Sequence, residues 1–219
     1  MSIPLKPNQH VARLRIIAGP NGSGKSSYFY QLKNEVDTGV WINADELNAE
    51  LIQKGYIEFD KIGFTPGKKQ WKAFVRLKRS VSFLEQFDLG EALNFIEFGK
   101  FILSVGQKMD NNALSAFIAD FFRYALINRG IKFTTETVFS HPSKLQLKKE
   151  ATAKRFKTYL YFICTESPEL NIQRVKSRTN KGGHSVPDQK IIEQYNKSLE
   201  VLRASIPLFD RVFIFDNSL

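Results

Sequence analysis

The chain has 219 residues, a formal net charge of +10 and a single cysteine. Hydrophobic residues make up 42% of it and charged residues 25%, which excludes disordered and collagen-like proteins. Cys164 alone can form neither an internal disulfide nor a multi-cysteine metal site, so we expect a reducing, cytoplasmic location. No stretch approaches 18 apolar residues, and the N-terminal residues lack the apolar run of a secretory signal. We therefore expect neither a membrane span nor a leader.

Five apolar stretches alternate with helical ones, a pattern typical of a parallel sheet covered on both faces by helices. Helix starts are marked by Asn43 with Glu46, which resembles a capping box, and by Ser167 followed by proline. We predict a three-layer α/β fold, with a mostly parallel five-stranded sheet, forming a single domain over residues 1–219. The expected strands are residues 13–18, 40–43, 131–139, 158–164 and 211–215.

A glycine-rich loop follows the first expected strand. Residues 19–26 read GPNGSGKS and satisfy the pattern G-x-x-x-x-G-K-[ST] at every position. The glycines let successive N–H groups turn toward phosphate oxygens, and the following helix adds the positive end of its dipole. We expect Lys25 to reach the β- and γ-phosphates of ATP and the Ser26 hydroxyl to coordinate Mg²⁺. The predicted nucleotide-binding residues are Gly19, Pro20, Asn21, Gly22, Ser23, Gly24, Lys25, Ser26 and Ser27.

An acidic residue, Asp45, comes directly after the second expected strand. It lies where the strands of an α/β sheet end and ligands bind, so it could accept a proton from a substrate hydroxyl. An equally good reading is that Asp45 only offsets the dipole of the following helix. A motor or switch NTPase would end an apolar strand in an acidic Mg²⁺ ligand, but the strand at 158–164 has no acid until Glu166.

Residues 60–112 do not fit the alternation of strands and helices. They indicate two Phe-rich helices that break near residues 88–90, so we predict an all-helical insertion within the domain. Lys68, Lys72, Arg76 and Arg79 are spaced as one stripe on a helix. A solvated face is the first interpretation of this stripe, ahead of an anionic substrate or partner and of nucleic acid.

Three further charged residues are candidates for the site. Glu136 stands in an otherwise uncharged strand, so it either pairs internally or faces a ligand, and the strand end favours the ligand. Arg174 and Arg178 share one helix face at i and i+4. They precede a polar segment with two adjacent glycines, Gly182 and Gly183, which favours a closing lid over a solvated surface.

Several motifs together resemble the zeta-toxin family of P-loop kinases. The most selective is the GGH-x-VP segment with the following Y-x-x-SL, within residues 174–202. The matching pieces are GPNGSGKSS at 19–27, INADE at 42–46, TTETVFS at 134–140, RVKSRTNKGGHSVPDQKIIEQYNKSLEVL at 174–202 and FDNS at 215–218. They run in family order over roughly three quarters of the chain, whereas the insertion has no counterpart.

The resemblance implies a cytoplasmic kinase that uses ATP and Mg²⁺ to phosphorylate a hydroxyl of a nucleotide sugar such as UDP-N-acetylglucosamine. It implies a toxin–antitoxin system, with an antitoxin protein as a partner. Asp45 would be the catalytic base and would also bind substrate. Lys25 would bind the phosphates, and Arg174 and Arg178 would face the transferring phosphate. Glu136 and Thr137 would touch the substrate.

Two other functions stay open on the residues alone. One is a kinase of a different hydroxyl-bearing metabolite. The other is a nucleic-acid-associated P-loop NTPase, for which the basic stripe would bind phosphate backbones.

Overall fold

The computed structural model describes residues 11–219 except 64, 101, 107–110 and 181–185. The chain divides into two compact units, Met1–Ser23 with Val138–Leu219, and Gly24–Thr137. The boundary after Ser23 falls inside the glycine-rich loop, so its residues 19–23 belong to the first unit and the rest to the second. Among the described residues, no helix is both long and apolar enough to span a membrane.

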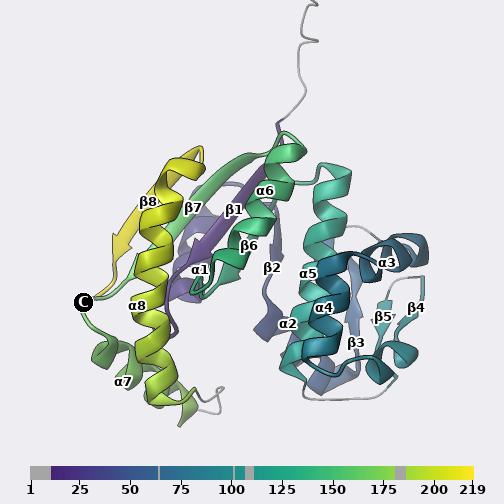
Figure 1. The fold of residues 1–219 in the computed structure, drawn as a ribbon, viewed down its shortest axis with the longest axis horizontal. Coiled ribbons are helices and arrows are strands. Elements are labelled where there is room, and N and C mark those ends of the chain that lie inside the picture. The colour runs from purple at the N-terminus through teal and green to yellow at the C-terminus, as the bar shows by residue number, and fades with distance from the viewer. Residues whose placement is uncertain (1–10, 64, 101, 107–110, 181–185) are drawn as a thin grey trace, which may run out of the picture. The chain divides into compact units, whose positions relative to one another are not determined.

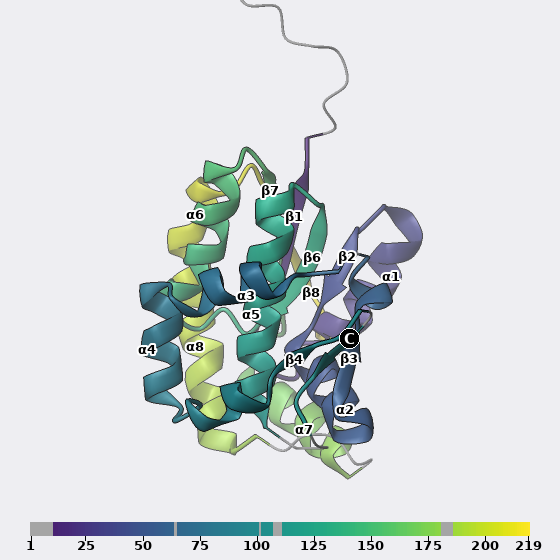
Figure 2. The same cartoon turned by 90° about the vertical axis from the view of Figure 1, so that its right-hand side faces the viewer.

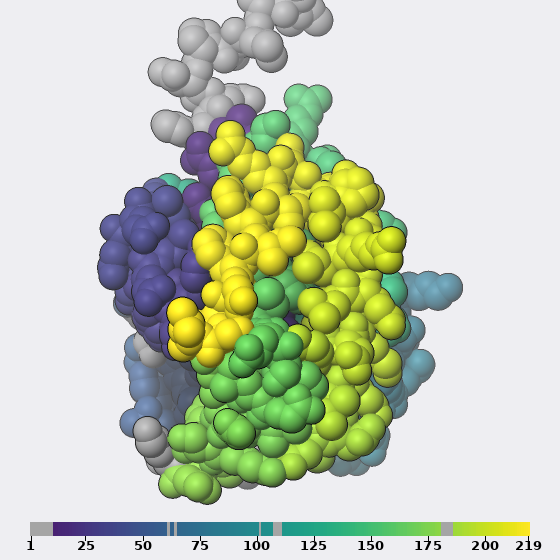
Figure 3. All heavy atoms as spheres, turned by 90° about the vertical axis from the view of Figure 1, so that its left-hand side faces the viewer, coloured from purple at the N-terminus to yellow at the C-terminus, as the bar shows by residue number. Residues whose placement is uncertain are grey.

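The first unit is built on three parallel strands. Strand β1 (Arg13–Ala18) pairs with β7 (Lys157–Cys164), which pairs in turn with β8 (Arg211–Asp216). Helices α6 (Leu145–Ala153) and α8 (Asp188–Ser205) cover one face of these strands (Figures 1 and 2). Strand β8 lies beside α8 at the surface (Figure 3). The Ser167 side chain caps α7 (Pro168–Thr179), as predicted.

The second unit carries the segment after the loop and the insertion. It contains α1 (Lys25–Glu35), β2 (Val40–Ile42), α2 (Ala44–Lys54), α5 (Asn112–Arg129) and β6 (Phe133–Thr137). Strand β2 pairs with β6 in parallel. The edge-to-face contacts of Trp71 with Phe117 and Phe121 join the insertion to α5. Large apolar side chains from both segments therefore form one core in this unit.

The predicted fold class is confirmed. The main sheet has the strand order β2-β6-β1-β7-β8, and the β1–β7, β7–β8 and β2–β6 pairings are parallel. This is the strand order and direction of a P-loop α/β fold.

The prediction of an all-helical insertion is wrong. Besides α3 (Lys68–Val75) and α4 (Lys78–Gln86), the segment contains β4 (Glu97–Phe98) and β5 (Ile102–Ser104). These strands form an antiparallel sheet with β3 (Tyr56–Glu58), in the order β3-β5-β4. Strands of two and three residues are too short to show an alternating pattern in the sequence.

The predicted helical stripe is also interrupted. Helix α3 ends at its C-cap, Arg76. The next residue, Leu77, has an extended backbone and is the N-cap of α4. Figure 2 shows α3 and α4 as separate helices. Lys68 and Lys72 stay exposed on α3, whereas Arg79 on α4 forms an ion pair with Asp120. The four basic residues therefore do not form one continuous face.

Candidate active site

The first part of the glycine-rich loop, in the first unit, has a backbone that strongly favours glycine. Gly19 and Gly22 have φ of +143° and +82°. A Cβ at Gly19 would lie 2.1 Å from the carbonyl oxygen of Ile163, and one at Gly22 would lie 2.4 Å from that of Asn171. The loop therefore packs backbone to backbone against the end of β7 and against α7.

Two buried polar atoms in and beside this loop have no hydrogen-bond partner in the part of the chain that the structure describes. They are the hydroxyl oxygen of Ser23 and the side-chain nitrogen of Asn171. The side-chain oxygen of Asn171 accepts a hydrogen bond from Thr165 at 2.6 Å, which leaves the amide nitrogen as an unused donor. Buried donors are usually paired, so unpaired ones beside a glycine cradle fit an anionic ligand.

The second part of the loop, in the second unit, begins α1. Gly24, with φ of +93°, precedes the helix, whose N-terminus has neither a side-chain cap nor an acidic residue in its first turn. The Lys25 side chain is 5% exposed, and its Nζ lies 3.7 Å from Oε1 of Glu136. The Ser26 hydroxyl donates a 2.8 Å hydrogen bond to Oε2 of the same carboxylate. The structure thus places Glu136 beside both of the chemically important residues of the motif.

Asn43 connects the end of β2 to Glu136. Its side-chain nitrogen donates to Oε2 of Glu136 at 3.2 Å, and its side-chain oxygen accepts from the N–H groups of Asp45 and Glu46 at 2.8 and 3.4 Å. One amide therefore caps α2 and also orients the Glu136 carboxylate. The sequence predicted the cap but gave no signal for the second contact.

The Glu46 half of the predicted capping box does not form. The Glu46 carboxylate instead accepts hydrogen bonds from Trp41 Nε1 at 2.8 Å and from the Tyr30 hydroxyl at 3.3 Å. The negative charge of Glu46 raises the pKa of Tyr30. Asp45, one residue earlier, is exposed, and within the described residues its carboxylate accepts no hydrogen bond. Of these two acids, Asp45 is therefore the one available to a ligand.

Thr137, the last residue of β6, is half-buried directly after Glu136. Its predicted contact with the substrate stays a prediction.

Arg174 and Arg178 belong to the first unit. The Arg174 guanidinium donates to the main-chain oxygens of Asn217, Ser218 and Leu219 at 2.7, 3.5 and 3.4 Å. The Asn217 side chain in turn donates to the main-chain oxygen of Ser23 at 2.8 Å, so Arg174 is connected to the loop through residues after β8. Arg178 is exposed.

The predicted lid lies mostly outside the described residues, which omit 181–185. The helix that follows it does reach the loop. Gln194 accepts a 2.9 Å hydrogen bond from the Asn21 side chain, and the Tyr195 hydroxyl donates to the main-chain oxygen of Thr165 at 2.6 Å. Burial raises the pKa of Tyr195, so this hydroxyl stays a donor. Neither contact follows from the sequence alone.

The chain matches no protein-family model and no curated protein sequence, but it is similar to several solved structures. A presumed kinase from Chloroflexus aurantiacus aligns with a TM-score of 0.53 and 14% identity, over 97% of this chain and 88% of that one. A chain of the PezAT toxin–antitoxin system of Streptococcus pneumoniae aligns with the same score and identity, over 97% and 71%. A chain of the Pnkp1/Rnl/Hen1 RNA repair complex aligns with a TM-score of 0.50 and 15% identity, over 90% and 47%.

At these identities the similarity defines the fold alone. The chain has the fold of the P-loop kinases.

Proposed function

We propose that this protein is an ATP- and Mg²⁺-dependent kinase that transfers the γ-phosphate to a hydroxyl of a small molecule. The observation that carries the proposal is the contact of Lys25 and Ser26 with one carboxylate, that of Glu136. A phosphate-binding lysine, a hydroxyl and an acid placed together are the protein groups that phosphoryl transfer requires around the β- and γ-phosphates.

The residues near the loop fit a nucleotide with its magnesium ion. The positive-φ glycines, the buried unpaired donors of Ser23 and Asn171 and the uncapped start of α1 all suit phosphate oxygens. When bound, Mg²⁺ would neutralise the charge that develops on the phosphates. Ser26 and Glu136 are the residues that would hold it. We assign Glu136 to this role in preference to the substrate contact that the resemblance implies, because its carboxylate is already bonded to Ser26.

Asp45 is the proposed catalytic base and substrate ligand. Its backbone is fixed by the Asn43 cap, and its carboxylate is exposed and unpaired among the described residues. A carboxylate in this state can accept the proton of an attacking hydroxyl. Asn43 supplies the helix cap, so α2 does not need Asp45 as a cap.

Arg174 and Arg178 are proposed to stabilise the transferring phosphate. Arg178 is exposed on the last turn of α7 and could donate to phosphate without breaking the contacts of Arg174. Arg174 also holds the residues after β8, so its contribution includes positioning.

The proposed substrate class is a nucleotide sugar such as UDP-N-acetylglucosamine, on the strength of the zeta-toxin motifs. The similarity to a chain of a toxin–antitoxin system is consistent with this class and with an antitoxin partner. The second candidate is a nucleic-acid-associated NTPase. The similarity to an RNA repair protein and the exposed lysines of α3 favour it.

The test is a mass-spectrometric search for metabolites that gain about 80 daltons, one phosphoryl group, when incubated with the protein, ATP and Mg²⁺. We expect Lys25→Ala, Asp45→Asn and Glu136→Gln each to lower the transfer rate by about a hundredfold or more, because positioned charges near a transferring phosphoryl group contribute several kcal/mol. Glu166→Gln is the matched control, since this exposed acid follows β7, and it should retain activity.

Normal transfer by Lys25→Ala or Glu136→Gln would contradict the kinase assignment. ATP hydrolysis that requires RNA or DNA, without any phosphorylated metabolite, would favour the second candidate.

A further inference from the structure

The N-terminal ends of β1, β7 and β8, at the sheet edge away from the glycine-rich loop, carry a group of cationic and aromatic residues. The proposed function does not use them. In the registers of β1 with β7 and of β7 with β8, Arg15 is paired with Tyr159 and Tyr159 with Arg211. Paired residues of parallel strands lie on the same face of the sheet, so Tyr159 stands between two arginines. Arg13 lies two residues before Arg15 and therefore shares this face.

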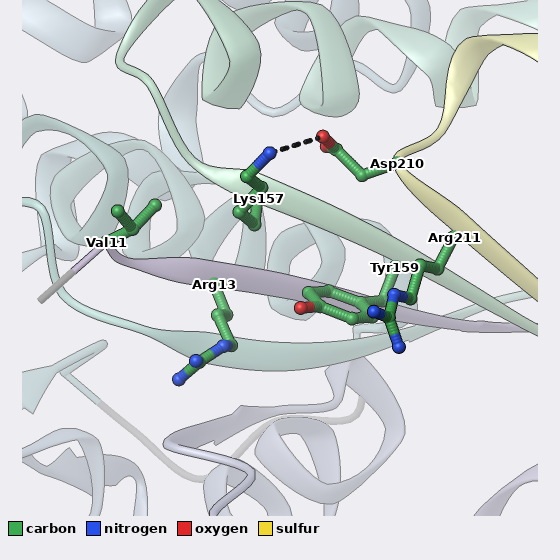
Figure 4. Close-up of a pocket in the computed structure, with 6 residues that line it drawn as sticks. All are labelled: Val11, Arg13, Lys157, Tyr159, Asp210 and Arg211. Carbon is green, nitrogen blue, oxygen red and sulfur yellow. Dashed lines mark hydrogen bonds and ion pairs between the residues drawn. The ribbon is translucent and has the colours of Figure 1, made fainter.

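Figure 4 shows how these side chains lie. Arg13, Tyr159 and Arg211 extend to the same side of the strands, while Lys157 and Asp210 point toward one another. A cavity of about 360 Å³ lies among these residues and is also lined by Val11. That volume falls in the range of sites that bind small ligands, at its lower end.

The cavity has a surplus of positive charge. Asp210 is the one carboxylate among the described residues that line it, and it accepts hydrogen bonds from Lys157 at 3.2 Å and from the N–H and hydroxyl of Thr158 at 2.8 Å each. The main-chain hydrogen bond from Thr158 is the largest cause that lowers the pKa of Asp210, so this acid stays ionised and engaged. Arg13 and Arg211 are exposed, and within the described residues neither has an ion-pair partner. Two guanidinium groups are therefore uncompensated at this cavity.

A buried arginine that contacts the Tyr159 ring, outside the lining of the cavity, is a second observation that favours an anionic ligand. Arg15 is 6% exposed, and its guanidinium carbon lies 5.5 Å from the centre of the Tyr159 ring. Its Nε and Nη1 atoms are buried and have no hydrogen-bond partner among the described residues. Burying part of a guanidinium without hydrogen-bond partners is costly, and a nearby anion would lower that cost. It also holds the Tyr159 ring in place by a cation–π contact.

We propose that this cavity binds a mononucleotide, with the phosphate held by Arg13 and Arg211 and the base against the Tyr159 ring. Guanidinium groups recognise phosphate by paired hydrogen bonds, and nucleotide bases stack on tyrosine. The next aromatic residue along β7 could not continue a stack, because Tyr161 is 7% exposed and packs against Phe213 with ring centres 5.0 Å apart. One open ring and a small cavity favour a single nucleotide over a strand of nucleic acid.

The proposed site is distinct from the glycine-rich loop. Strand β1 runs from Arg13, at this cavity, to Ala18, directly before the loop. Five residue steps of about 3.3 Å separate the two ends by about 16 Å. The inference does not rest on the proposed kinase activity, since it uses none of the residues assigned to that reaction.

The experiment is photolabelling with 8-azido-AMP, followed by identification of the labelled peptide and calorimetric titration with AMP. We expect the label on the peptide that contains Tyr159. The double variant Arg13→Gln/Arg211→Gln should weaken AMP binding and lower labelling at least about tenfold, because each loses a charge-assisted contact. Both residues are exposed at strand ends, so the fold should survive.

Two matched variants control for overall charge and for nucleotide bound at the loop. Lys68→Gln/Lys72→Gln removes the same two positive charges from the exposed face of α3 and should leave labelling of the Tyr159 peptide unchanged. Lys25→Ala should also retain it, because the site does not use the loop lysine. If Lys25→Ala abolishes this labelling, or if the two double variants weaken it equally, the proposed site is wrong.

The ligand class is tested in the same titrations. Adenosine and ribose 5-phosphate should each bind at least about tenfold more weakly than AMP, because each lacks one of the two contacts. Tyr159→Leu should weaken AMP binding, whereas Tyr159→Phe should not. Equal binding of ribose 5-phosphate and AMP would refute the role of the ring. Tighter, arginine-dependent binding of a single-stranded oligonucleotide would refute the choice of a mononucleotide.

Discussion

Replacing Gly22 by alanine should both destabilise the protein and disable the glycine-rich loop. An alanine at φ of +82° has the strain of a left-handed L-residue, about 1–2 kcal/mol. Its Cβ would start 2.4 Å from the carbonyl oxygen and 2.9 Å from the Cα of Asn171. Asn171 is fully buried, so a backbone shift of at least about 0.6 Å is needed to reach 3.0 Å, at a cost of about 1–3 kcal/mol. The expected loss in the free energy of unfolding is about 2–5 kcal/mol.

Two other glycines separate the strain from the clash. Gly130 has φ of +66° but nothing within 4 Å of an added Cβ, so Gly130→Ala should show the backbone strain alone, about 1–2 kcal/mol. Gly67 has neither but is the N-cap of α3, so Gly67→Ala should cost only the difference in capping, about 1 kcal/mol or less. Urea denaturation measures all three variants, and titration with an ATP analogue measures the loop. A loss at Gly22 no larger than that at Gly130, or unchanged nucleotide affinity, would refute the close packing of the loop against α7.

Three further predictions concern other groups. Asn43→Ser keeps an oxygen to cap α2 but removes the amide donor to Glu136, so thermal stability should change little while phosphoryl transfer falls about tenfold or more. Equal loss of both would mean that Asn43 is only a cap. A main-chain hydrogen bond from Thr158 holds the pKa of Asp210 below its ordinary value of 3.8. The ionised Asp210 therefore stabilises the fold above that pH, and this stabilisation is lost as the pH falls through the lower folded-state pKa. Wild type should therefore lose more stability than Asp210→Asn on acidification from pH 5 to 2, and parallel acid-denaturation curves would contradict this. Arg178→Ala and Arg174→Ala should each lower the turnover rate more than the affinity for ATP, and the double variant should lose less than the sum of the two single losses in activation free energy. Additive losses, or a fall in ATP affinity alone, would contradict a shared role of the two arginines in stabilising the transition state.

The sequence predicted those features that are encoded by short-range patterns. The alternation of apolar strands and helices predicted the sequence along the chain of the strands that form the main sheet. The motif G-x-x-x-x-G-K-[ST] placed the loop between β1 and α1. The cap at Ser167 formed as expected, because a cap depends on residues that are two or three positions apart. Local chemistry was sufficient in these cases.

Features that depend on tertiary contacts were missed. Glu46 satisfies the pattern of a capping box, but its carboxylate accepts hydrogen bonds from the indole of Trp41 and the hydroxyl of Tyr30 instead of from the start of α2. The basic residues of the insertion keep helical spacing across Arg76, yet α3 ends before Arg76 and α4 begins at Lys78. Periodicity cannot report such a break, because the residues on both sides of it keep the same spacing.

Glu136, the acid beside the loop, shows that contacts at the candidate site also cannot be read from local patterns in the sequence. The strand at 158–164 has no acid at its end until Glu166, which is exposed and whose N–H bonds to Ser218. The structure instead brings Glu136, at the end of β6, to Ser26, 110 residues away along the chain. Neighbours in a sheet are set by strand order rather than by chain order, so an acid on a strand that is distant in sequence can still reach the loop. Glu136 was a candidate from its sequence surroundings alone, since an ionised group in an otherwise uncharged strand needs a partner or a ligand. Identifying that partner as Ser26 and Lys25 required the fold, and it moves Glu136 from the substrate to the proposed magnesium ion.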